Sequence, residues 1–409
     1  MSFYTSLAVL LFSAIALIVP SGFSLGAVML VLGALCLLRR NAARFSLSGE
    51  DKALMLAFAL YFLINTLLNV LHHAAGNEYD QHLRFVLAIP ALLLLLAYPP
   101  RASAFWAGLA LGGIGAIVLS LWQLRVGHIE RPGGSTNPIQ YGNIALVLAT
   151  TCACGLAWAR HQQRAMAWTL LLLLGTITGL AASFISGSRG SWMALPACVV
   201  LAVVLASRRH TGALVRNAAI VLIAALVVLW AVPQTGFKAR IELAVSETSN
   251  YMHKNNAEVA ETSVGARLEM WRVGVGMLSG HLLTGWGKKG LMDHKAQLVE
   301  QGLASPGVLD HSHLHNEYLD ALVKRGIPGL LAVFILYGVP LVLFARHLRD
   351  GEGPRKYALA GILLVVSYMM FGLTQAFLTH NNGVMILAFL MAILWAKVRT
   401  TPAHPTTFA

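Results

Sequence analysis

Long apolar runs that carry almost no charge limit the possible folds of this chain more than any other feature. A helix that crosses a membrane needs about 20 mostly apolar residues, and twelve stretches come close to that length. The twelve predicted spans are residues 4–20, 22–38, 53–71, 85–98, 103–122, 141–159, 166–185, 192–206, 217–232, 327–344, 357–377 and 384–396. We therefore predict an all-α polytopic membrane protein with about 12 transmembrane helices.

The composition excludes a soluble enzyme. Of the 409 residues, 57% are hydrophobic and 11% are charged, whereas a soluble domain carries about 25% charged residues. The four cysteines all lie inside apolar runs, so they offer neither a disulfide framework nor the spacing of a zinc site. The first apolar run lacks the basic segment of a cleaved signal peptide, so we expect it to remain as a span.

Basic residues are distributed unevenly between the two sides of the predicted bundle. Twelve spans put both termini on one side, where the short loops hold 16 Lys and Arg against 4 in the short loops of the other side. Short cytoplasmic loops are enriched in Lys and Arg, so we predict cytoplasmic termini. The net charge of +13 then reflects topology and attraction to membrane lipids, and we expect no nucleic-acid partner.

These boundaries divide the chain into four parts. Residues 1–232 hold nine spans, 233–326 form one large helical periplasmic segment, 327–396 hold three spans, and 397–409 form a cytoplasmic tail. No Asp, Glu, Lys or Arg lies in the apolar centre of any span, which argues against an ion-coupled transporter. We therefore expect the chemistry in the outer segment.

One apolar stripe in the outer segment repeats at helical spacing. We predict that Thr262 or Ser263 caps this helix and that Gly280 ends it, with Arg267 and Arg272 on the two sides of the stripe. The alternative is an interfacial helix whose arginines hold lipid phosphates. The stripe consists of Val264, Leu268, Trp271, Val275 and Leu278.

Residues 311–319 form the densest polar cluster of the chain. A helix over about 314–325 would place His315 and Tyr318 on one packed face, and Gly326 would mark the junction with the next span. His315 could be a buried structural histidine, a general base, or, with His311 and His313, part of a zinc site that lacks the HExxH pattern. The residues alone leave these three interpretations open.

Two predicted outer loops carry further polar candidates. Arg189 lies between glycines in the tight turn 186–192, where it could bind a phosphate through two parallel hydrogen bonds or extend to ordinary lipid headgroups. Asn137 lies in the loop 133–142, whose small and amide side chains could bind sugar hydroxyls or simply begin the next helix.

In order and separation, these outer motifs resemble the O-antigen ligase and polymerase superfamily of bacterial inner membranes. The resemblance covers about residues 133–331. The motifs are Ser186-Gly187-Ser188-Arg189-Gly190, Arg267-Leu268-Glu269-Met270-Trp271, Gly285-Trp286-Gly287, His315-Asn316-Glu317-Tyr318-Leu319 and the sequence from Gly326 to Leu331.

The resemblance implies a GT-C-like, metal-independent, inverting glycosyltransferase with its active site at the periplasmic face of the inner membrane. An O-antigen ligase moves a polysaccharide from undecaprenyl diphosphate to lipid A–core. By resemblance, Arg189 and Arg267 bind the diphosphate, His315 is essential and His313 is a possible substrate contact. As further substrate-binding candidates we add Asn137, Tyr318 and Arg272. No metal and no cofactor is expected.

The chemistry of glycosyl transfer agrees with these roles. Two guanidinium groups can stabilise the charge that develops on a diphosphate leaving group, and a neutral imidazole can accept the proton of the acceptor hydroxyl. An O-antigen polymerase and a protein O-oligosaccharyltransferase of the same superfamily remain alternatives. A flippase of lipid-linked oligosaccharides is a further alternative, although it would be expected to carry charged residues within its spans.

Overall fold

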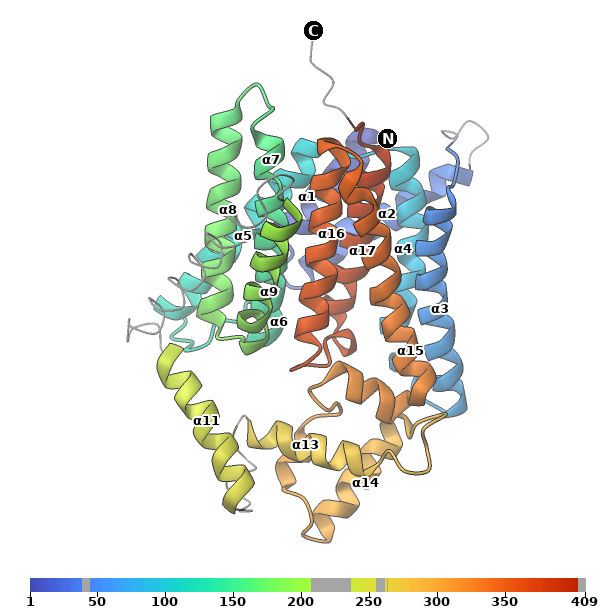
Figure 1. The fold of residues 1–409 in the computed structure, drawn as a ribbon, viewed down its shortest axis with the longest axis vertical. Helices are drawn as coiled ribbons and strands as arrows, with labels where there is room; N and C mark the ends of the chain where they lie inside the picture. The colour runs from blue at the N-terminus through green and yellow to red at the C-terminus, as the bar shows by residue number, and fades with distance from the viewer. Residues whose placement is uncertain (39–44, 207–236, 255–261, 263, 404–409) are drawn as a thin grey trace.

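The computed structural model describes residues 1–38, 45–206, 237–254, 262 and 264–403, and every regular element within these ranges is a helix (Figure 1). Seven of the described helices are long and apolar enough to cross a membrane, which supports a multi-pass membrane protein. They are α3 (Gly49–Leu71), α4 (Asp80–Ala97), α5 (Ala102–Arg125), α6 (Pro138–Cys154) with its extension α7 (Leu156–Ala159), α8 (Ala165–Ser186), α15 (Glu317–Arg346) and α17 (Asn381–Thr400).

Shorter or less apolar helices complete the bundle. These are α1 (Ser2–Ala14), α2 (Gly22–Gly33) with η1 (Ala34–Leu38), α9 (Arg189–Ala206) and α16 (Glu352–Phe371). Every predicted span that falls on described residues coincides with a helix, and the predicted span 217–232 lies outside the described residues. The count of about 12 spans and the GT-C-like fold stay predictions.

The centre of the bundle is formed by α6 and α17. All side chains of α17 from Asn382 to Val398 are buried, and a helix that is apolar on every side is stable only when neighbours surround it. Small residues allow close helix packing elsewhere: a Cβ on Gly113 of α5 would lie 2.3 Å from the carbonyl oxygen of Gly175 in α8.

The described residues of the predicted outer segment, 233–326, form a separate helical layer at one end of the bundle. Figure 1 shows α11 (Phe237–Lys254), α13 (Gly265–Gly276) and α14 (Gly287–Glu300) at the end opposite the N-terminus and the last turn of α17. This layer has its own small apolar core, which excludes water from beneath the polar loops. The core contains Met270, Val273, Met277, Leu291, Val308, Leu314 and Val323.

The predicted apolar stripe of α13 is wrong. Val275 is 59% exposed, whereas Met270, Val273 and Met277 are nearly fully buried, and the helix ends at Gly276 rather than at Gly280. Two apolar stripes overlap in this sequence, and contacts with residues far along the chain, such as Leu291 and Leu314, select the one that is buried. The predicted cap is present, because the Thr262 hydroxyl accepts a hydrogen bond from the Gly265 N–H at 3.1 Å.

The helix after the histidines begins later than predicted. Asn316 is the N-cap of α15, and its side chain accepts hydrogen bonds from the N–H groups of Tyr318 and Leu319 at 3.1 and 3.0 Å. His315 therefore precedes the helix and does not lie on one of its faces, which corrects the prediction. Gly326, with φ of 65°, divides α15 into an outer part and the part that enters the bundle, as the sequence predicted.

Candidate active site

Two adjoining cavities lie between the bundle and the helical layer. The larger one, the histidine cavity, has a volume of about 640 Å³ and is lined by Arg267, His311 and His315 among others. The smaller one, the arginine cavity, has a volume of about 260 Å³ and is lined by Arg131, Arg189 and Arg267 among others. Arg267 lines both cavities, so a ligand beside the arginines lies next to the histidines.

Arg189 is held by a tight turn between α8 and α9. Gly187 ends α8 with a left-handed φ of 68°, and Arg189 is the first residue of α9. The Ser188 hydroxyl donates to Asn143 at 2.8 Å and fixes the turn on α6. The Nη1 atom of Arg189 is buried and has no hydrogen-bond partner among the described residues. A guanidinium in this state at a helix N-terminus is suited to bind an anion.

Arg267 reaches the same cavity from α13. The first turn of this helix is fixed by the Thr262 cap and by Glu247 of α11, which accepts a hydrogen bond from the Val264 N–H at 3.1 Å. Burial, and then the positive charges of Arg189 and Arg131, lower the pKa of Arg267 to about 10, against the opposing effect of Glu247. Arg267 remains charged at neutral pH, so the cavity concentrates positive charge that a bound anion would offset.

The third arginine of the cavity, Arg131, was not among the sequence candidates. Its guanidinium donates to the carbonyl oxygens of Ser186 and Gly187 at 3.4 and 3.3 Å. It therefore fastens the loop before α6 to the turn that carries Arg189. Only the count of basic residues in short outer loops pointed to Arg131, and that count did not place it beside Arg189.

The histidine loop, residues 311–316, is anchored at almost every position. The buried Lys295 donates to the carbonyl oxygen of His311 at 2.8 Å. The Leu314 N–H donates to Asp320 at 2.9 Å, and the Leu314 carbonyl accepts from the indole of Trp271 at 2.9 Å. His315 itself has a left-handed φ of 50°, a strained backbone conformation for a residue with a side chain and one that is common at functional sites.

A buried glutamine holds the ring of His315. The Oε1 atom of Gln375 lies 2.5 Å from His315 Nδ1, and the Nε2 atom of Gln375 lies 2.7 Å from His380 Nε2. An amide oxygen can only accept, so Nδ1 of His315 carries the hydrogen and its Nε2 keeps a free lone pair. Neither Gln375 nor His380 was predicted, because both lie in a loop about 60 residues further along the chain.

The surroundings of His315 keep its ring neutral. Burial, and then the positive charges of Arg267 and His311, lower the pKa of His315 to about 3, although the hydrogen bond with Gln375 opposes this shift. Burial likewise lowers the pKa of His380 to about 4 and lowers that of His313. At neutral pH these imidazoles are therefore uncharged.

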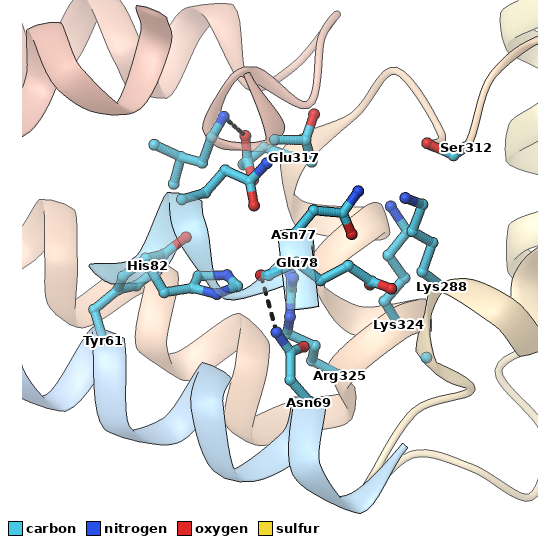
Figure 2. Close-up of a pocket in the computed structure, with 14 residues that line it drawn as sticks. Tyr61, Asn69, Asn77, Glu78, His82, Lys288, Ser312, Glu317, Lys324 and Arg325 are labelled. Atoms are coloured by element: carbon cyan, nitrogen blue, oxygen red, sulfur yellow. Dashed lines mark hydrogen bonds between the residues drawn. The ribbon is translucent and has the colours of Figure 1, made fainter. Parts of the chain in front are cut away.

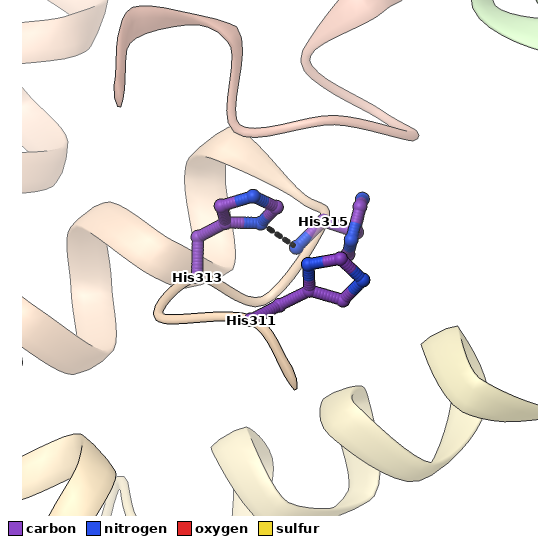
Figure 3. A group of neighbouring side chains, drawn as sticks. All are labelled: His311, His313 and His315. Carbon is purple, nitrogen blue, oxygen red and sulfur yellow. Dashed lines mark hydrogen bonds between the residues drawn. The ribbon is translucent and has the colours of Figure 1, made fainter. Parts of the chain in front are cut away.

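The three loop histidines are also close enough to be considered as a metal site (Figure 3). One ring nitrogen from each of His311, His313 and His315 lies within 4.8 Å of the others, whereas tetrahedral zinc, with bonds of about 2.0–2.1 Å, needs them about 3.3 Å apart. The Nδ1 atom of His313 accepts from the His315 N–H at 3.3 Å. To bind a zinc ion, the three rings would have to move closer together. The ion would have to be bound by ring nitrogens that the protein's own hydrogen bonds leave free.

Two other sequence candidates, Asn137 and Tyr318, lie in different environments. Asn137 lines the histidine cavity, and its Oδ1 caps α6 by accepting from the Ile139 N–H at 2.8 Å. Tyr318 does not line either cavity, and its hydroxyl donates to the carbonyl of Met369 at 2.9 Å.

Arg272 also lies outside both cavities. It pairs with Glu269 through contacts of 3.0 and 2.6 Å and donates to the Leu303 carbonyl. His313 is buried behind His315, with the two ring centres 4.3 Å apart. The structure thus brings together Arg189, Arg267, Asn137 and His315, with His313 beside them, whereas Tyr318 and Arg272 bond to other parts of the protein outside the two cavities.

Comparisons with known proteins agree with the resemblance inferred from the motifs. Residues 174–334 match the family model described as O-antigen ligase. An uncharacterized protein of Haemophilus influenzae is 28% identical over 385 residues, which cover 94% of this chain and 95% of that protein. The family match includes both cavity arginines of α9 and α13 and the whole histidine loop, but not Arg131, Gln375 or His380. Over residues 174–334, the chain is therefore similar to the O-antigen ligase family.

Proposed function

We propose that this protein is an O-antigen ligase, which transfers a polysaccharide from undecaprenyl diphosphate to lipid A–core at the periplasmic face of the bacterial inner membrane. One observation carries the proposal most strongly. Arg189 has a buried nitrogen without a partner among the described residues, and it shares a cavity with Arg131 and Arg267 directly beside the histidine cavity. A lipid-linked diphosphate sugar supplies both an anion for the arginines and an anomeric carbon beside the histidines.

In this reaction the arginines stabilise the leaving group. As the bond between C1 of the first sugar and the diphosphate oxygen breaks, negative charge accumulates on the diphosphate. Fixed guanidinium groups in a partly dehydrated cavity interact more strongly with that charge than with the ground state. Because several arginines surround one anion, a divalent cation is not required, and we propose that the enzyme is metal-independent.

His315 acts as the general base. Its Nε2 atom accepts the proton of the acceptor hydroxyl while the hydroxyl oxygen forms the new bond to C1, and undecaprenyl diphosphate departs from the opposite side. The anomeric configuration is therefore inverted. Gln375 holds Nδ1–H and so keeps the lone pair of Nε2 available, and Asn137 in the same cavity is placed to bind a sugar hydroxyl.

The decisive experiment is reconstitution of the purified protein with undecaprenyl-diphosphate-linked glycan, with and without lipid A–core. Product that forms only with lipid A–core supports a ligase. Growth of the glycan chain without lipid A–core would instead identify a polymerase, and transfer to a protein acceptor would identify an O-oligosaccharyltransferase. Failure of all three reactions would contradict the proposal.

The proposed orientation can be tested with a matched pair of exposed glutamines. Gln301 follows α14 in the helical layer, and Gln163 lies between α7 and α8 near the opposite end. A membrane-impermeant thiol reagent added to intact spheroplasts should label Gln301→Cys and should label Gln163→Cys only after the membrane is opened. The reverse pattern would place the helical layer in the cytoplasm and overturn the proposed localisation.

A further inference from the structure

A second polar cavity lies on the other side of the histidine loop (Figure 2). Its volume is about 100 Å³, several times the ~10–15 Å³ that one water molecule requires. Side chains of α3, α4, α14, α15 and the segment before α4 line it. Ser312 lines this cavity, whereas the adjacent His311 lines the histidine cavity. The two cavities are thus separated by the thickness of one loop.

One hydrogen-bond donor in the wall of this cavity lacks a partner. The Nε atom of Arg325 is buried and has no hydrogen-bond partner among the described residues. His82 is 2% exposed, and its ring is hydrogen-bonded to the backbone of Glu78. Buried polar atoms are almost always paired in folded proteins, so the cavity is built to hold a group that accepts hydrogen bonds.

The wall carries both acidic and basic groups. Glu78 already accepts a hydrogen bond from the Ala75 N–H at 3.2 Å, and Glu317 accepts one from the Leu378 N–H at 2.7 Å. Lys324, which also lines the cavity, is paired with Asp320 at 2.8 Å.

By contrast, Lys288 and Arg325 form no ion pair with any described acidic residue. Figure 2 shows both of them directed toward the space beside Asn77 and Glu78. The acidic groups of the wall are engaged within the protein, and the available donors are cationic.

We propose that this second cavity binds a phosphate monoester, such as the phosphate of a phosphorylated sugar. Arg325 and Lys288 supply both the charge and the hydrogen-bond donors, and a compact tetrahedral anion fits the small volume. Since only one loop separates the cavity from the histidine cavity, a phosphate group bound here would lie close to the site of the acceptor. The link to an acceptor rests on the proposed function, whereas the anion site itself does not.

Binding can be measured directly on the full-length protein in detergent or nanodiscs. The probes are a hexose 6-phosphate, the same hexose without phosphate, and glycerol 3-phosphate as a mimic of a lipid headgroup. We expect both phosphates to bind and the neutral hexose not to bind. Tighter binding of the hexose ester identifies a sugar phosphate as the source, and tighter binding of the glycerol ester identifies a lipid headgroup.

Matched variants locate the site. Lys288→Met and Arg325→Lys should weaken phosphate binding about tenfold to a hundredfold, the usual effect of losing a charged hydrogen bond. Lys289→Met changes an exposed neighbour that does not line the cavity and should leave the affinity unchanged. The melting temperature of each variant without probe shows whether it is folded, and Lys288→Met keeps the test valid if Arg325→Lys is unstable.

Three results would overturn the inference: equal binding of the neutral hexose, no binding of either phosphate, or equal weakening by Lys289→Met. His315→Gln should leave phosphate binding intact, which separates the two proposals. Glycan transfer without phosphate binding would contradict this inference alone, and phosphate binding without any transfer would contradict the proposed function alone.

Discussion

Arg399 and Arg267 are both partly buried arginines at opposite ends of the molecule, yet their surroundings are opposite in charge. Arg399 donates to the two carboxylate oxygens of Asp51 at 3.0 and 3.4 Å, and Trp395 donates to the same carboxylate. Arg267 faces Arg189 and Arg131, and only Glu247 opposes their repulsion. Arg399 is thus neutralised within the protein, whereas the cavity around Arg267 leaves positive charge for a ligand to neutralise.

Two histidines repeat this contrast. His347, near the termini, is bonded between Glu50, at 2.9 Å, and Asp350. His315 is bonded to the neutral amide of Gln375, and the charges that act on its pKa are the positive ones of Arg267, His311 and His380. A histidine between two carboxylates serves structure, while a histidine kept neutral beside a cavity can accept a proton.

The largest effect that this comparison predicts is at His315. Loss of a positioned general base costs roughly 10²–10⁴-fold in rate, or about 3–5 kcal/mol of barrier. We therefore expect His315→Gln and His315→Asn to lose nearly all transfer while they still bind the lipid-linked donor. Donor binding and turnover should be measured on the same purified protein.

The matched control is His347→Gln, which should keep near-normal turnover. Retained turnover in His315→Gln would show that His315 only positions the acceptor. Loss of donor binding in that variant would instead place His315 among the groups that bind the diphosphate.

A somewhat smaller loss is expected from Arg189→Lys and Arg267→Lys. A lysine keeps the charge but cannot offer two parallel donors to phosphate oxygens, so turnover should fall about tenfold to a hundredfold. Arg399→Lys, at the other end, should stay near wild type because its partner is internal. If either cavity variant folds normally and turns over at the wild-type rate, that arginine is a headgroup anchor rather than a diphosphate ligand.

A shift in pH dependence is predicted for Gln375→Glu. The wild-type base has a pKa of about 3, so its protonation should not reduce the rate above about pH 4. A carboxylate against Nδ1 favours the charged imidazole and raises the pKa by about 1–3 units. The neutral base is then lost as pH falls through a value between about 4 and 6, because Arg267, His311 and His380 still oppose the charged imidazole.

The corresponding measurement is kcat/KM between pH 4 and 8. Gln301→Glu, which adds the same charge on the exposed part of the helical layer, should leave the profile of the wild type unchanged. An identical profile for Gln375→Glu would mean that Gln375 does not orient the base.

The smallest expected effect is that of chelation, which should leave transfer intact. The arginines supply the charge that a divalent cation would otherwise provide, and the hydrogen bonds of His313 and His315 occupy one nitrogen of each ring. Activity lost on exhaustive chelation and restored by Mg²⁺, Mn²⁺ or Zn²⁺ would revive the interpretation of the three loop histidines as a metal site.

The sequence predicted the helices of the bundle well because membrane helices are specified locally, by runs of apolar residues. Arg189 and Arg267 could be chosen because the short motifs that contain them, Ser186–Gly190 and Arg267–Trp271, resemble those of the family. The seven helices that are clearly long enough do not by themselves establish twelve spans.

Features that depend on distant contacts could not be predicted. The buried face of α13 is selected by Leu291 and Leu314, and the ring of His315 is oriented by Gln375, about 60 residues away. The same limit applies to Tyr318 and Arg272, because each donates a hydrogen bond to a carbonyl far along the chain, that of Met369 for Tyr318 and that of Leu303 for Arg272.

The bend at Gly326 has a consequence for how precisely the histidines can be positioned. Its backbone is left-handed, and a Cβ there would lie 2.5 Å from the carbonyl oxygen of Leu282. That same oxygen accepts the Ile327 N–H at 2.7 Å, and the Trp286 N–H donates to Val323 at 2.8 Å. The loop 282–286 therefore clamps α15 on both sides of the bend.

Without such a clamp, α15 would act as a lever. Its nine outer residues extend about 13 Å at 1.5 Å per residue, so a tilt of about 10° would displace its first residue by roughly 2 Å, well beyond the ~0.5 Å tolerance of a catalytic group. Membrane helices tilt readily as bilayer thickness varies. The clamp at Gly326 would then keep His315 in the same position when the thickness of the surrounding bilayer varies.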